Sequence, residues 1–160
     1  MTLSTIYNDS ELKCVIADEE HVIGATDLIN HAFKYQDEAK GDIRITSEKL
    51  RERMQKSEFY VFIDKSNKVM GTLYIDRLKD SLHFGLLALD DSLRGGVAGR
   101  EIVQSIEMYA KLLHKHELEL DYMGLSPWLK SYYEKYGFKE TGLKEDIGWC
   151  ELIRMTKSLK

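Results

Sequence analysis

Apolar and polar positions follow two different periods along the chain, and they divide it into alternating short elements. Continuous or alternating apolar runs bounded by polar turns predict strands. Apolar residues recurring every three or four positions predict helices with one buried face. We expect strands over 12–17, 58–63, 69–75, 82–89, 118–123, 138–141 and 150–156, and helices over 18–36, over 46–55 with Thr46 as its cap, from Gly99 to about 116, and after Ser126.

A glycine-rich loop, Arg94-Gly-Gly-Val-Ala-Gly99, joins the apolar run 84–89 to the longest predicted helix. The first backbone N–H groups of a helix have no partner within the helix, so such a loop can bind an anion. It is not a P-loop, because Arg100-Glu101 follows the last glycine where Lys and Ser or Thr are needed. The loop is therefore either a phosphate cradle or only a helix entry.

A second segment, Ser126 to Phe138, reads Ser-Pro-Trp-Leu-Lys-Ser-Tyr-Tyr-Glu-Lys-Tyr-Gly-Phe. Ser126 suits an N-cap, and Pro127 suits the first helical position. Gly137 is expected to end the short helix before another strand begins.

In this order and at this distance, the two segments resemble the GNAT superfamily of acyl-CoA-dependent N-acyltransferases. The acyl-CoA loop of that family follows Gln/Arg-x-x-Gly-x-Gly/Ala, and its late helix commonly ends Leu-Tyr-Glu-Lys-x-Gly-Phe. Residues 132–138 match the latter at every position except the Leu. With Arg94 leading the first pattern, Gly99 fits the last position and Val97 stands at the central glycine; this register keeps Ile102 and Val103 at apolar helix positions.

The resemblance covers nearly the whole chain and implies a fold. That fold is an α+β, three-layer (α/β) GNAT fold with a mixed central sheet of about seven strands and about four flanking helices. Its N-terminal strands would form an antiparallel meander. Residues 1–160 would be a single N-acetyltransferase domain.

The resemblance also implies a reaction: transfer of acetyl from acetyl-CoA to a primary amine, by direct attack through a tetrahedral intermediate. The loop would hold the pyrophosphate, and the backbone of the preceding strand would hold the pantetheine arm and the thioester carbonyl. Gly85 within that strand predicts a bulge. The residues expected to bind acetyl-CoA are Leu87, Ala88, Leu89, Arg94, Gly95, Gly96, Val97, Ala98, Gly99 and Arg100.

Two residues are candidates for the chemistry. Tyr133 matches the family tyrosine that protonates the departing thiolate, although it could equally be a packing aromatic. His83 lies six residues before Leu89, where some relatives place a glutamate base. A histidine can accept a proton near neutral pH. The alternatives are an ordered water as the base and His83 as a plain strand-edge residue.

Composition limits the other functions. A formal charge of −4 argues against general nucleic-acid binding. No apolar run approaches membrane-spanning length and no signal-peptide core is present, so we expect no membrane partner and a cytoplasmic location. Cys14 and Cys150 are isolated, and the histidines lack metal-ligand spacing, so we expect no metal.

The acceptor is open to interpretation: a small-molecule amine or an amine on a peptide or protein. Residues 34–44, with Tyr35, Asp37, Glu38 and Asp42, could face a cationic amine or form a solvated loop. The charged run 49–56 reads as a solvated helix face. A homodimer is common in the family, but nothing in the sequence establishes one. The competing functions are a non-catalytic acyl-CoA sensor with this fold and an interaction protein with a purely structural loop.

Overall fold

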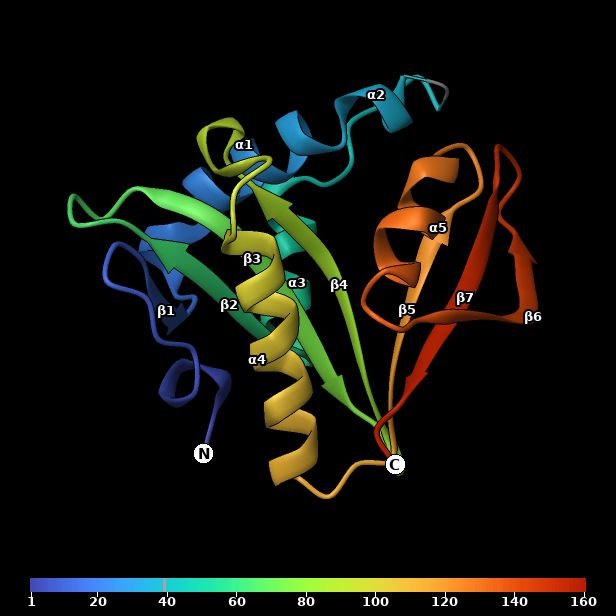
Figure 1. Cartoon of the computed structure of the whole chain (residues 1–160). Helices are drawn as coiled ribbons and strands as arrows, with labels where there is room; N and C mark the ends of the chain where they lie inside the picture. Colours follow the sequence, from blue (N-terminus) through green and yellow to red (C-terminus); the bar gives the residue numbers. More distant parts are fainter. Residues whose placement is uncertain (39) are drawn as a thin grey trace.

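One mixed sheet organises the molecule, and its strands run in the order β1-β2-β3-β4-β5-β7-β6 (Figure 1). The computed structural model describes residues 1–38 and 40–160 and, of these, the side chains of all but 35 and 36. Neighbouring strands are antiparallel except for the parallel pair β4–β5. This confirms the predicted meander and mixed sheet. The strands are β1 (Lys13–Ile16), β2 (Glu58–Ile63), β3 (Val69–Arg77), β4 (Ser81–Leu89), β5 (Glu117–Met123), β6 (Lys139–Asp146) and β7 (Glu151–Ser158).

Helices cover both faces of the sheet, which makes three layers (Figure 1). On one face α1 (Val22–Ala32) packs against β3 and β4, and α3 (Ser47–Lys56) packs against β2. On the other face α4 (Ala98–Leu112) packs against β4 and β5, and α5 (Pro127–Glu134) packs against β5. Short helical turns complete the chain: η1 (Leu3–Thr5), η2 (Glu19–His21), α2 (Lys34–Asp37) and η3 (Asp91–Leu93).

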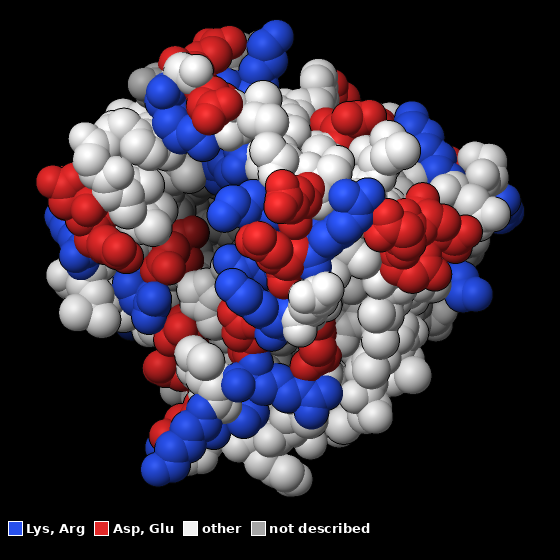
Figure 2. Space-filling view, turned by 180° about the vertical axis from the view of Figure 1, so that it is seen from behind, with Lys and Arg blue, Asp and Glu red and all other residues white. Residues whose placement is uncertain are grey.

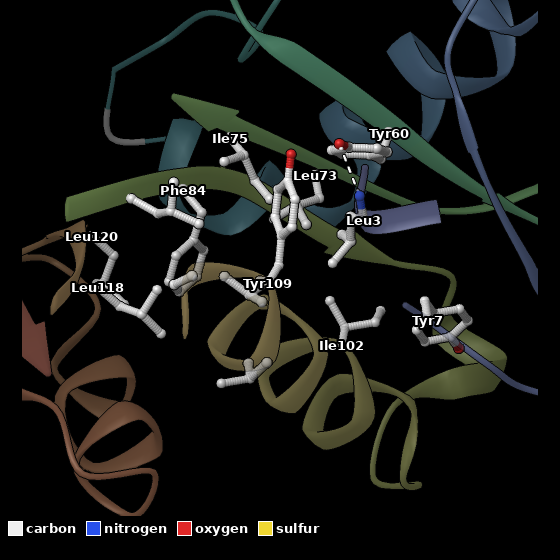
Figure 3. Close-up of a cluster of buried hydrophobic side chains, with 14 of the residues drawn as sticks. Leu3, Tyr7, Tyr60, Leu73, Ile75, Phe84, Ile102, Tyr109, Leu118 and Leu120 are labelled. Carbon is white, nitrogen blue, oxygen red and sulfur yellow. Dashed lines mark hydrogen bonds between the residues drawn. The ribbon is translucent and has the colours of Figure 1, made fainter. Parts of the chain in front are cut away.

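The run Glu58–Ile63 shows why this sequence builds a sheet that is buried on both sides. Tyr60 and Phe62 face the α4 layer, whereas Phe59, Val61 and Ile63 face the α1 layer. Because side chains alternate along a strand, one apolar run supplies both cores. Figure 3 shows the α4 core, where Tyr109 lies among aliphatic residues and the Tyr60 hydroxyl accepts a hydrogen bond from the Leu3 amide at 3.2 Å.

Two predicted helices are shorter than expected. The helix predicted over 18–36 is interrupted at Phe33, which leaves helical geometry (φ −101°, ψ 10°) and takes its ring under the Arg44 guanidinium, 4.3 Å away. The helix predicted to reach residue 116 ends at Leu112, because His114 adopts a left-handed conformation (φ 59°). Tertiary contacts and a local cap override the periodicity in both places.

Of the two predicted N-caps, one forms a capping hydrogen bond and the other does not. The Thr46 side chain accepts a hydrogen bond from the Lys49 amide at 3.1 Å, as predicted. Ser126 occupies the N-cap of α5 but makes no capping hydrogen bond, and its buried hydroxyl has no partner among the described residues. Gly137 does follow the end of α5 with φ +96°, a conformation that favours glycine.

Candidate active site

The parallel strands β4 and β5 pair only near their N-terminal ends and then separate. Their register runs from Ser81–Glu117 to His83–Glu119 and continues no further. Figure 1 shows the resulting V-shaped fork between the two strands, with α4 beside one arm and α5 beside the other. Beyond His83, the β5-facing edge of β4 therefore has no strand partner within residues 1–38 and 40–160.

A histidine–glutamate pair sits at the point of separation. His83 Nδ1 lies 3.0 Å from Glu119 Oε1, and the side chains are only 13% and 11% exposed. Arg154 reaches the same carboxylate oxygen at 3.4 Å and binds Asp121 more closely, at 2.6 Å. A carboxylate on Nδ1 fixes the ring's orientation and leaves Nε2 as the remaining nitrogen.

A bulge in β4 follows the fork directly. Tyr74 pairs with Gly85 and Thr72 with Ala88, so Leu86 and Leu87 together oppose one residue of β3. Leu86 takes φ 50°, which is uncommon for a leucine, and the buried Thr72 hydroxyl donates to its carbonyl at 2.8 Å. This confirms the irregularity that Gly85 predicts.

Gly85 itself is needed for packing. A Cβ at this position would lie 2.6 Å from atoms of the Tyr74 ring, far closer than van der Waals contact allows. The same ring stacks on His83 with centroids 6.0 Å apart and also lies under Arg53 at 4.4 Å. The bulge, Tyr74 and His83 are thus one packed unit.

The glycine loop ends at an uncapped helix N-terminus. Within the part of the chain that the structure describes, no side chain caps α4, whose N-cap residue is Val97, so its first backbone N–H groups have no capping partner there. Val97 has φ −93°, a region open to any residue, so a valine fits without strain. Gly95 has φ +76° and open space where a side chain would be, which leaves room for a ligand against the loop.

A cavity of about 440 Å³, called here the loop cavity, lies between this loop and α5. Of the predicted cofactor residues, it is lined by Leu87, Ala88, Leu89, Arg94, Gly95, Gly96 and Gly99. Val97, Ala98 and Arg100 are not among its lining residues. The cavity has nine further lining residues that the sequence motif did not indicate as cofactor-binding: Ala32, Phe33, Leu93, Trp128, Leu129, Tyr132, Tyr133, Lys135 and Tyr136.

Gly99 has a particular neighbour in this cavity. A Cβ on Gly99 would stand 2.6 Å from the Tyr132 hydroxyl, so the glycine lets this tyrosine reach the start of α4. Lys135 lies over the rings of Tyr132 and Tyr136 at 4.6 and 5.4 Å. With Arg94, it places positive charge at the cavity, where a diphosphate would fit. The donor set therefore suits an anionic cofactor.

Tyr133 belongs to a cluster of aromatic rings. Its ring meets Phe138 at 5.8 Å, Phe84 at 6.3 Å and Tyr132 at 5.1 Å between centroids, each edge to face. Burial raises the pKa of its phenol well above the usual value, with a smaller contribution from Tyr136. The raised pKa keeps this phenol protonated at neutral pH, and its hydroxyl makes no hydrogen bond within the described residues, so it is free to donate one.

A second cavity, of about 630 Å³, lies on the α3 side of the fork and is called here the α3 cavity. His83, Tyr74 and Asp121 line it, together with one face of α3. The two cavities share four lining residues and so adjoin one another: Phe33, Leu87, Leu129 and Tyr133. The fork is therefore reached from two directions.

The acidic residues predicted to face an amine near residues 34–44 are placed differently. Asp37 is buried and binds Arg44, with Nη2 and Nε of the arginine 2.9 and 3.0 Å from Oδ1. It is thus occupied by an ion pair. The side chain of Tyr35 lies outside the described residues, and Glu38 and Asp42 line neither cavity.

Three potential metal ligands also come together, at the start of α1: Asp18, Glu20 and His21. His21 Nδ1 accepts a hydrogen bond from the Asp18 amide at 3.1 Å, and the Asp18 side chain accepts one from the Glu20 amide. These contacts form a capping box, which accounts for the cluster.

Comparisons with known proteins agree with this architecture. A family model, the acetyltransferase (GNAT) domain, matches residues 29–159, and the chain belongs to this family. No individually curated protein matches the sequence. None of the described helices combines the length and apolar composition needed to cross a bilayer.

Solved structures share the fold at low sequence identity. Spermidine N-acetyltransferase from Vibrio cholerae, in complex with CoA and spermine, has a TM-score of 0.73 at 18% identity and covers 94% of this chain and 97% of its own. A GNAT-family acetyltransferase from Bacillus anthracis has a TM-score of 0.72 at 15% identity, covering 96% and 98%. One from Staphylococcus aureus Mu50 has 0.71 at 15% identity, covering 93% and 99%.

Proposed function

We propose that this protein is an acyl-CoA-dependent N-acyltransferase that moves acetyl from acetyl-CoA to a primary amine, as a single domain over residues 1–160 working in the cytoplasm. The observation that carries the proposal is the fork between β4 and β5, where the loop cavity and the α3 cavity share Leu87 and Tyr133. Family membership supports the acetyltransferase class.

The loop cavity is the proposed site for acetyl-CoA. Backbone N–H groups at the uncapped start of α4 would bind the diphosphate, helped by the helix dipole and by Arg94. The free edge of β4 at Leu87–Leu89 would pair with the pantetheine arm, because β5 no longer occupies it. Acetyl-CoA supplies an activated thioester; the protein supplies position and protons.

The proton transfers can be assigned to two residues at the fork. In the proposed reaction the amine nitrogen attacks the thioester carbonyl carbon, the C–N bond forms, and the C–S bond breaks. With Nδ1–H donating to Glu119, Nε2 of His83 would take the proton that the amine loses, directly or through water. Tyr133 would give its hydroxyl proton to the departing thiolate.

Turnover tests the proposal. The protein is incubated with acetyl-CoA and a panel of primary amines, while free CoA thiol is followed and the acetylated amine is identified by mass spectrometry. We expect thiol release that depends on the amine and equals the acetylated product. Release without any acetylated amine, or no release with any amine, would overturn the proposal.

A substitution in the glycine loop tests whether this activity depends on the loop. Gly95→Val forces a β-branched residue into φ +76°, so the Michaelis constant for acetyl-CoA should rise about tenfold or more. The constant for the amine should change much less. An unchanged acetyl-CoA constant would separate the loop from cofactor binding.

A further inference from the structure

One face of α3 carries a charge pattern directed at the α3 cavity. Lys49, Glu52, Arg53 and Lys56 are spaced so that they share a helix face, and all four line this cavity. Lys49, Glu52 and Lys56 are exposed, as predicted for a solvated face, whereas Arg53 is half-buried at the cavity. Figure 2 views the molecule from behind and shows basic and acidic side chains interspersed across this side.

Two of the carboxylates around the α3 cavity have close partners. Asp121 lies 2.6 Å from Arg154, whereas Glu52 makes only a long, exposed contact with Lys49 at 3.7 Å. Glu119 holds His83. A polycation entering this cavity would find one loosely held carboxylate, Glu52, beside several cations, so the cavity is poorly suited to a polyamine.

Two of the cations are available by comparison. Arg53 lies over the Tyr74 ring at 4.4 Å, a contact that fixes the guanidinium. Its polar contacts, from Nη1 to Ser57 Oγ at 3.4 Å and to Asp76 at 3.8 Å, are both long and involve one nitrogen, so the other N–H groups can bind an anion. Lys56 has no acidic partner within 4.0 Å among the described residues. A guanidinium and an ammonium side by side on one helix face form a binding site for an anion.

The position of Arg53 relates this anion site to the reaction. Tyr74, which lies under Arg53, also stacks on His83, the proposed base. One aromatic ring therefore contacts both the anion-binding side chain and the base. A short molecule with an anionic group at one end and an amine at the other could reach both.

We propose that the acceptor is a small primary amine that also carries an anionic group, a carboxylate or a phosphate, bound by Arg53 and Lys56. This inference rests on the proposed function and adds the class of substrate. It differs from the cationic amine that an acidic wall of residues 34–44 would select, because Asp37 is committed to Arg44.

The test compares matched amines on the full-length protein at saturating acetyl-CoA. Amino carboxylates of increasing chain length are each paired with their own neutral carboxamide, and aminoethyl phosphate and diaminopropane are added. We expect kcat/KM for the best anionic amine to exceed that of its neutral counterpart by about tenfold or more. Carboxylate and phosphate members of the panel decide which anion is preferred.

Variants locate the preference. Arg53→Gln and Lys56→Gln should each lower the ratio of anionic to neutral amine by about tenfold, through KM for the amine and not through KM for acetyl-CoA. Lys56 is exposed, so its variant should fold even if the loss of the Arg53 stacking weakens the protein. Arg51→Gln is the matched control, because Arg51 lies on the same helix but binds Glu19 at 2.7 Å.

The outcomes separate the two proposals. Efficient acetylation of neutral amines or diamines, with no gain from an anionic group, would overturn the inference and leave the acyltransferase proposal standing. An anionic preference that survives both variants would also overturn it. Failure to acetylate any amine would overturn both.

Discussion

Replacing Tyr133 with phenylalanine tests the proposed general acid, because the structure predicts a large loss of activity with almost no change in stability. The Tyr133 hydroxyl makes no hydrogen bond within the described residues, while its ring packs against Phe84, Phe138 and Tyr132. Removing an unbonded hydroxyl and keeping the ring should change the free energy of unfolding by less than about 0.5 kcal/mol. A general acid typically contributes about 10²–10⁴-fold, so kcat should fall at least about 100-fold.

The pH dependence adds a second readout. Burial raises the pKa of Tyr133, and a general acid acts in its protonated form, so kcat should show no loss attributable to this phenol up to about pH 10. The assay is amine-dependent thiol release, with thermal unfolding on the same preparations. Tyr7→Phe serves as the control and should retain most activity, because the buried Tyr7 hydroxyl also lacks a partner among the described residues and Tyr7 lines neither cavity. A Tyr133→Phe enzyme within twofold of the parent would refute the assignment.

Three further predictions concern the supporting structure. Thr72→Val removes the hydroxyl that donates to the Leu86 carbonyl at 2.8 Å, so it should lower the free energy of unfolding by about 1–2 kcal/mol in denaturant and raise KM for acetyl-CoA. An unchanged free energy of unfolding would show that this hydrogen bond does not hold the bulge. Ser126→Ala should change unfolding by less than about 0.5 kcal/mol, whereas a capping serine would cost about 1 kcal/mol. Burial, and then the neighbouring Asp9, raise the pKa of Glu101, so this carboxyl favours the folded state at low pH and that contribution is lost as pH rises through the raised pKa. Glu101→Gln should therefore raise Tm at pH 8 and have little effect at pH 4, and a lower Tm at pH 8 would contradict this reasoning.

The sequence predicted the order of strands and main helices because these depend on local patterns. The run 58–63 is apolar enough to be buried on both faces, and the glycine loop and Gly137 mark two helix boundaries. The interruption at Phe33 escaped prediction, since its cause is a contact with Arg44, eleven positions further along the chain. Periodicity carries no information about such a contact.

The residues of the candidate site differ in the same respect: some stand in local sequence motifs, and others are brought to the site only by the fold. Tyr133 and the loop glycines stand in local motifs, so the sequence could nominate them. Glu119 could not be nominated, because only the parallel register of β4 and β5 brings it to His83. Arg53 and Lys56 belong to a charged pattern that is typical of an ordinary solvated helix, and only the tertiary structure places them at a cavity. Roles that depend on pairing between distant segments have no local signal.

The most direct test of the central claim is calorimetric titration of the protein with acetyl-CoA, followed by addition of the preferred amine to the same sample and measurement of free thiol. We predict binding of one acetyl-CoA per chain with a dissociation constant in the range of about 1 μM to 1 mM, and thiol release only once the amine is present. Binding without release on addition of any amine would identify an acyl-CoA sensor. An absence of binding would mean that the loop before α4 is only a helix entry, and the account of the fork as an acyl-transfer site would be wrong.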